Sequence, residues 1–148
     1  MNDHSSKASL FLMELIIAIL IFSLSSALCV QLFAKAHLLS NNTKDLNHAI
    51  SLCESVAEVY YGVNGDMEQI QKILDPTQLS IYSDHQIIFY YNNNFELCTN
   101  SQFSYQLSFS TRREGLLELA EIIVTKQSSD EKIYELSLKR YGRYKNEK

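Results

Sequence analysis

The sequence predicts an α+β protein in which a long N-terminal α-helix packs on a C-terminal antiparallel β-meander. Residues 10–33 are apolar apart from Glu14, a few serines and Gln31. After them, apolar residues recur every three or four positions, which is the period of an amphipathic helix. Beyond Leu79 the period changes to two, as in half-buried strands. The chain therefore divides into a transmembrane helical segment (10–33), an amphipathic continuation (34–62) and a globular sheet domain (63–148).

The apolar segment is long enough to cross a membrane, because roughly 20 helical residues span a bilayer core. Its one carboxylate, Glu14, is unusual there. An ionisable group at membrane depth costs on the order of 2.5–3.5 kcal/mol, although less near an end of the span. Two interpretations of Glu14 stay open from the residues alone: it reaches the polar interface, or it pairs with a cation.

The helix is expected to continue to about Tyr61, since no glycine or proline interrupts it before Gly62. A stripe from Leu39 to Tyr60 is predicted to cover the sheet, while the opposite face, which includes Asp45, is predicted to face solvent. The full apolar stripe begins before Leu39 and consists of Leu32, Ala36, Leu39, Thr43, Leu46, Ile50, Cys53, Ala57 and Tyr60.

A short helix is predicted over residues 67–74, where Asp66 is a suitable N-cap and Pro76 ends the helix. Two strands are predicted on either side of an asparagine turn, at residues 87–91 and 95–98.

Further strands are predicted around the alternating residues 103–109, at 116–126 and at 134–138. Residues 112–115 are interpreted as a hairpin loop, and a change of parity between Leu119 and Ile122 suggests a bulge. Short loops between successive strands favour an antiparallel meander.

The residues that could carry chemistry are few. Cys53 and Cys98 could form a disulfide if the domain lies outside the cell, and Cys29 is interpreted as a small packing residue. His37 and His48 are too far apart in sequence to bind one metal ion. No phosphate-binding loop or catalytic motif occurs, so we expect no enzyme activity, no metal and no cofactor.

The C-terminal tail, residues 139–145, alternates basic and aromatic side chains, a pattern that can bind single-stranded nucleic acid. A solvated chain end has the same composition. The net charge of −4 gives no general attraction to nucleic acid, so we do not expect nucleic acid as a partner.

The N-terminal residues resemble the leader junction of type IV pilins and pseudopilins. They read Lys7-Ala8-Ser9-Leu10-Phe11-Leu12-Met13-Glu14-Leu15-Ile16. The family pattern is a basic residue and glycine, a cleavage point, then Phe-Thr-Leu, a hydrophobic residue and Glu. Leu12, Met13 and Glu14 match it, whereas Ser9 stands where the family has glycine, and Leu10 and Phe11 stand where it has Phe and Thr. The resemblance implies the pilin fold, and these departures favour a minor pilin or pseudopilin over a major subunit.

The same resemblance implies a function. Residues 1–9 would be a leader removed by a prepilin peptidase between Ser9 and Leu10, and the new amine would be methylated. Glu14 would be the family's fifth-position glutamate, which faces the free N-terminal amine of a neighbouring subunit or of its own. The protein would be a single-pass cell-membrane protein with an extracytoplasmic C-terminal domain. Its helix would assemble with other pilin-like subunits into a pilus, or a type II secretion or competence filament.

An alternative is a secreted or signal-anchored extracytoplasmic binding domain without a filament role. Ala34-Lys35-Ala36 fits a signal-peptidase site. Against this alternative, the apolar segment is longer than the usual signal core of about 7–15 residues and contains Glu14.

Overall fold

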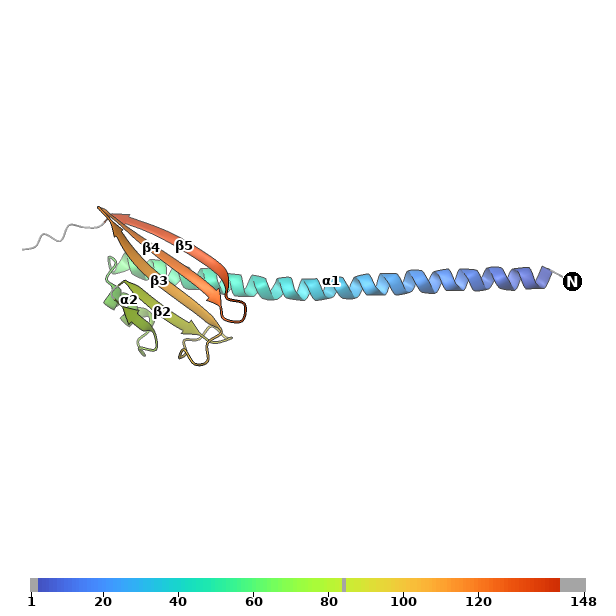
Figure 1. The fold of residues 1–148 in the computed structure, drawn as a ribbon, viewed down its shortest axis with the longest axis horizontal. Helices are drawn as coiled ribbons and strands as arrows, with labels where there is room; N and C mark the ends of the chain where they lie inside the picture. Colours follow the sequence, from blue (N-terminus) through green and yellow to red (C-terminus); the bar gives the residue numbers. More distant parts are fainter. Residues whose placement is uncertain (1–2, 84, 142–148) are drawn as a thin grey trace, which may run out of the picture. The chain divides into compact units, whose positions relative to one another are not determined.

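In the computed structural model the described residues are 3–83 and 85–141, with side chains from Ser9 onward. The two helices are α1 (Asp3–Gly62) and α2 (Met67–Leu74) (Figure 1). The five strands are β1 (Ile81–Ser83), β2 (Gln86–Tyr91), β3 (Tyr105–Glu114), β4 (Leu117–Lys126) and β5 (Glu131–Tyr141). The predicted α+β class is confirmed. The chain forms two units, one ending at Thr43 and one beginning at Lys44, which are described separately.

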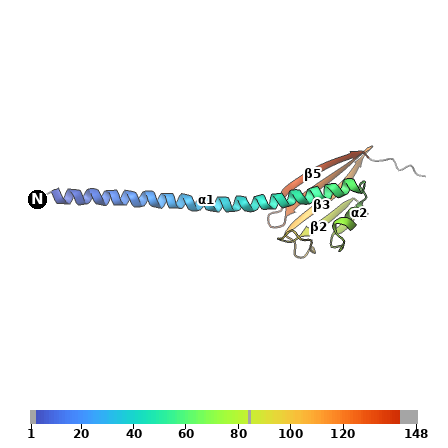
Figure 2. The same cartoon turned by 180° about the vertical axis from the view of Figure 1, so that it is seen from behind.

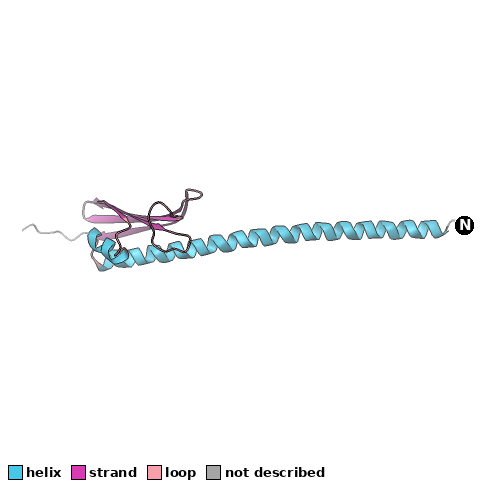
Figure 3. Ribbon diagram, turned by 90° about the horizontal axis from the view of Figure 1, so that it is seen from below, coloured by secondary structure: helices cyan, strands magenta, loops and turns pink. Residues whose placement is uncertain are grey.

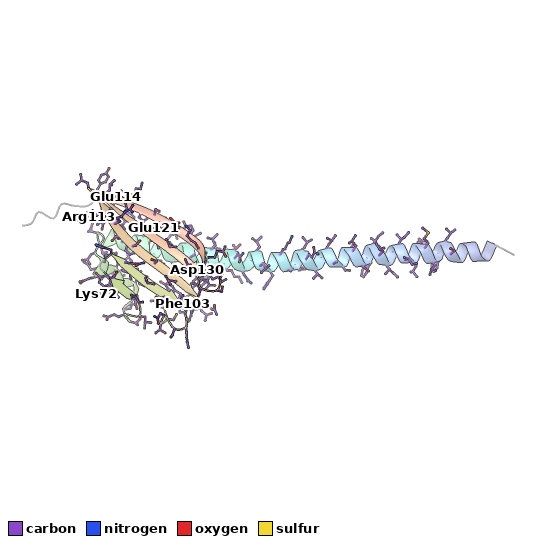
Figure 4. All side chains as sticks on the ribbon, viewed as in Figure 1. Lys72, Phe103, Arg113, Glu114, Glu121 and Asp130 are labelled. Atoms are coloured by element: carbon purple, nitrogen blue, oxygen red, sulfur yellow. The ribbon has the colours of Figure 1, made fainter. Side chains whose placement is uncertain are left out.

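The first unit is helical from Asp3 onward, so Ser9 and Leu10 lie inside α1 rather than at its start. Every described side chain from Ser9 to Thr43 is exposed. Figure 4 shows these side chains projecting all round the helix. α1 is long and apolar enough to cross a membrane, which is compatible with single-pass anchoring.

The second unit has two layers. The sheet is an antiparallel meander in the order β1-β2-β3-β4-β5, as predicted. Residues 44–62 of α1, together with α2, cover one face of this sheet (Figures 2 and 3). The core lies between the layers and consists of Ala49, Cys53, Val56, Tyr60, Ile70, Ile87, Phe89, Tyr91, Tyr105, Leu107, Phe109, Ala120, Ile122 and Val124.

α2 forms where the sequence predicted it. The Asp66 carboxylate accepts hydrogen bonds from the amides of Glu68 and Gln69, which would otherwise lack partners in the first helical turn. Ile70 points into the core and is fully buried. The helix ends before Pro76, which cannot continue it.

The helical stripe was predicted partly wrongly. Cys53 and Tyr60 are buried as expected, but the other two fully covered residues of α1 are Ala49 and Val56, while Leu39 is 68% exposed. The apolar arc of the helix is wider than one stripe, and the side chains that face the sheet are partly small ones. Small side chains at the contact let helix and sheet approach closely. The spacing of hydrophobic residues alone therefore does not predict which of them face the sheet.

The loop between β2 and β3 corrects a second prediction. Residues 95–98 form no strand, only one isolated bridge between Tyr91 and Leu97. The Asn92 side chain accepts hydrogen bonds from the amides of Asn94 and Glu96, and Phe95 adopts a φ of 59°. This local hydrogen bonding by an asparagine competes with strand pairing. β1, in turn, was not predicted.

Two predictions on β3 and β4 also need correction. β3 runs through Arg112 to Glu114, and only Gly115 and Leu116 form the loop, with Gly115 at a φ of 62°. No bulge separates Leu119 from Ile122, because the inward residue is Ala120 and the β3–β4 register is continuous. The irregularity lies at Val124 and Thr125, in the pairing of β4 with β5.

Candidate functional site

The apolar segment of α1, residues 10–33, is the candidate functional site. Leu10 is 66% and Phe33 78% exposed, although both are large hydrophobic residues. Apolar surface on this scale is rare on soluble monomers and marks a site of contact with lipid or protein. Nothing within the described residues covers it. The segment therefore requires lipid or another protein to cover its apolar surface.

Glu14 lies on this segment one helical turn beyond Leu10, and its side chain is exposed. Within the described part of the chain, no hydrogen bond, ion pair or ring contact reaches it. A carboxylate in an apolar environment is costly without a cation or donors nearby. The structure thus leaves Glu14 available for a partner outside the described residues.

Three serines on the same segment satisfy their hydroxyls inside the helix. Ser23, Ser25 and Ser26 each donate to the carbonyl oxygen four residues earlier, at 2.8–2.9 Å. Their polar atoms are therefore used, and what they offer a neighbouring helix is a small surface that permits close approach.

Asp45 was predicted to face solvent but is bound to the sheet. Its carboxylate accepts hydrogen bonds from the Tyr105 hydroxyl at 2.9 Å and from Lys126 Nζ at 2.6 Å. The hydrogen bond to Asp45 holds the pKa of Lys126 above its ordinary value. Asp45 therefore ties the helix to β3 and β4 near the beginning of the second unit.

A stack of rings lies beside this ion pair. Phe95 stands between His48 and Tyr105, with ring centroids 4.4 and 4.2 Å away and nearly parallel planes. Sequence reasoning missed this contact, because Phe95 was assigned to a strand. The stack holds the Phe95 ring between a side chain of α1 and one of β3.

A second ion pair closes the opposite end of the core. Arg140 of β5 binds Glu118 of β4, and its guanidinium lies 5.3 Å from the centre of the Tyr60 ring. Burial, followed by the charge of Glu118, raises the pKa of Tyr60. The sequence carried a signal for this ion pair in the alternation of inward and outward residues along β4 and β5. Glu118 and Arg140 occupy positions of the same parity as the inward-facing residues of their strands.

The cysteines are free in this structure. Burial, and then the charge of Glu54, raises the pKa of the Cys53 thiol to about 11. Such a thiol is a poor nucleophile at neutral pH. Cys98 is half-buried in the loop before β3 and donates weakly to the Gln102 carbonyl. The Cys53–Cys98 disulfide is not formed here and stays a prediction.

Two shallow hollows are present in the second unit. One of about 360 Å³ lies on the uncovered face of the sheet, where Arg112, Lys139 and Glu121 mix both charges (Figure 4 labels Glu121). The other, of about 410 Å³, lies beside α2 and Tyr82. Among the described residues, no three His, Cys, Asp or Glu side chains are grouped to bind a metal ion.

The C-terminal tail, in which basic and aromatic side chains alternate, is only partly described. Residues 142–148 lie outside the described part of the chain. Within it, Arg140 turns inward to Glu118 and is not available to bind a phosphate group.

No protein-family model matches this chain, and no curated protein or solved structure matches it either.

Proposed function

We propose that this protein is a pilin-like (pseudopilin) subunit that assembles through the first half of α1. The observation that carries the proposal is the exposed apolar segment 10–33 with Glu14 near its start, unpaired within the described residues. The continuous helix and the compact antiparallel sheet packed on its second half are compatible with the pilin fold.

Glu14 would find its partner through assembly. Among packed N-terminal helices the dielectric constant is low, so the amine of a neighbouring subunit, or of its own, would offset much of the cost of the carboxylate. A buried charge pair of this kind would also fix the axial register of neighbouring helices. The apolar helix alone would be stable in lipid, but without the charge pair nothing would fix the axial position of one helix relative to its neighbour.

The remaining elements of the proposal follow from the leader-like N-terminus. A prepilin peptidase would cut between Ser9 and Leu10, leaving a mature chain anchored once in the cell membrane with residues 63–148 outside the cytoplasm. The partners would be other pilin-like subunits of a pilus, or of a type II secretion or competence filament.

The direct test replaces Glu14 in the full chain by glutamine. We expect Glu14→Gln to insert into membranes as before but to be recovered with other filament subunits at least about tenfold less, because the charge partner is lost. Glu54→Gln is the matched control, since Glu54 is an exposed glutamate on the same helix. If Glu14→Gln assembles like the parent chain, the proposal is wrong.

The alternative function is a secreted or signal-anchored extracytoplasmic binding domain. The intact mass of the protein recovered from membranes and medium distinguishes it from a pilin-like subunit. A chain that starts at Leu10 and carries a methyl group supports the pilin-like subunit. A chain that starts at His37 supports secretion, and one that starts at Met1 supports a signal anchor.

A further inference from the structure

The sheet of the second unit has two open edges. β5 is 11 residues long, while β1 has three residues, all of them exposed. Among the described residues no strand pairs with the outer side of either. In such edge strands, part of the backbone N–H and C=O groups point away from the sheet and can pair with another strand.

The two edges have the same direction. Every neighbouring pair in the order β1-β2-β3-β4-β5 is antiparallel, so the first and fifth strands are parallel to each other. The β5 edge of one copy can therefore join the β1 edge of another without inverting either copy. Residues 44–62 of α1 then run the same way in both copies. Antiparallel pairing of two β5 edges would instead turn one copy end for end.

The side chains at the two edges also match by face. Tyr82 lies opposite the buried Ile87, so it belongs to the helix-covered face, yet it is 38% exposed. On β5 the apolar residues of that same face, Leu136 and Leu138, are only half-buried. Joining the edges places these incompletely covered side chains next to one another and removes apolar surface from water.

We infer that β1 of one copy docks on β5 of the next, so that the sheet continues from copy to copy. The inference rests on the proposed function, because a three-residue strand makes too few hydrogen bonds to hold two free molecules together. It becomes effective when anchored helices keep the copies at high local concentration. A contact between two different edges repeats in one direction, as an extended assembly requires.

The test uses cysteine pairs on the uncovered face of the sheet, in full-length protein in its native membrane. Ser83→Cys on β1 is combined in turn with Glu135→Cys, Ser137→Cys or Lys139→Cys on β5, in a chain carrying Cys29→Ala and Cys98→Ser. Neighbouring strands are about 4.8 Å apart, within the range that a disulfide bridges. Three β5 positions are used because the register between β1 of one copy and β5 of the next is not known, and one of the three should lie opposite Ser83→Cys.

We expect mild oxidation to give a ladder of disulfide-linked multimers from at least one double variant and from none of the four single variants. The matched control pairs Ser83→Cys with Ser110→Cys, which lies on the same face but on the central strand β3, and should give no ladder. Dimers from Ser137→Cys alone would show that two β5 edges meet, which overturns the inference.

Assembly itself is read out separately through the native Cys29, with a reagent that links two thiols. Cross-linking at Cys29 without any ladder from the edge pairs overturns the docking of β1 on β5 and leaves the proposed function standing. Absence of both kinds of cross-link overturns both.

Discussion

At the scale of single residues, the end of the core near the α1–α2 turn depends on one glycine. Gly65 has a φ of 78°, and a Cβ placed there would lie 2.4 Å from Arg140 Nη2. The same arginine binds Glu118 and covers the Tyr60 ring. A side chain at position 65 would therefore strain the backbone and push Arg140 from its buried partner.

Gly65→Ala should lower the free energy of unfolding by about 2–4 kcal/mol, from the left-handed backbone and the displaced ion pair. Gly62→Ala is the control, because its Cβ would meet open space at the end of α1, and it should be neutral or stabilising by up to about 1 kcal/mol. Urea unfolding followed by circular dichroism measures both. Equal effects of the two substitutions would contradict this account of Gly65.

Asp45→Ala should destabilise the protein by about 1–3 kcal/mol, because Tyr105 and Lys126 each lose a partly buried charged partner. Lys44→Ala, at the adjacent exposed position, should change stability by no more than about 0.5 kcal/mol. The same unfolding measurement applies. An Asp45→Ala chain as stable as the parent would mean that the contact contributes nothing.

Cys53 makes stability depend on alkaline pH. Its pKa is raised by burial from 9.0 to about 11, so between these values the unfolded chain loses a proton that the folded chain keeps. The part of the free energy of unfolding that depends on the Cys53 proton is therefore full below pH 9. It falls by about 2–3 kcal/mol as the pH rises through 11. Unfolding between pH 8 and 11 should show this slope together with that of Tyr60, Tyr91 and Tyr105, whose pKa values are also raised by burial, and Cys53→Ala should remove only the part due to the thiol. The control Cys29→Ala should leave it unchanged.

At the scale of elements, α1 is one uninterrupted helix whose two halves differ in their surroundings. Its first half exposes large apolar residues, whereas its second half buries small side chains, Ala49 and Cys53, as well as the large ring of Tyr60. The small residues let helix and sheet approach closely. Asp45 and the His48–Phe95–Tyr105 stack then hold the helix in one rotational setting at the edge of the core.

Ala49→Leu tests this close approach. Ala49 is fully buried, so three extra carbon atoms there should overpack the interface and cost about 1–3 kcal/mol. Ser51→Leu, two residues away on the exposed face, should cost less than about 0.5 kcal/mol. If position 49 accepts leucine as readily as position 51, the helix does not sit on the sheet as described.

At the scale of the whole molecule, the core belongs to the second unit. All core residues lie at or beyond Ala49, and no described residue from Ser9 to Thr43 is buried. The first unit is therefore expected to contribute contact with a partner rather than stability. The proposed function and the edge-to-edge docking both belong to this scale, because each concerns what several copies do together.

A chain of residues 44–148 should accordingly fold alone, stay in solution without detergent and unfold in one cooperative step. Circular dichroism and gel filtration measure this, with the full-length protein in detergent as the reference. Loss of cooperative unfolding in the shorter chain would show that residues 1–43 support the core.

The sequence by itself determined the elements whose signals are local. An apolar segment without breakers, the Asp66 cap, Pro76, and the alternation of Tyr105, Leu107 and Phe109 each act over a few residues, so their outcome follows from composition and spacing. The leader-like residues around Glu14 led to the pilin-like interpretation, which stays a prediction.

Only the tertiary structure decided which side of α1 meets the sheet, and that Phe95 stacks between His48 and Tyr105. It also brought Asp45 to Lys126 and Arg140 to Glu118. The physical reason is distance along the chain. These outcomes depend on how well surfaces from separate segments fit and on how their buried charges are paired, and neither quantity is set by the spacing of residues within one segment.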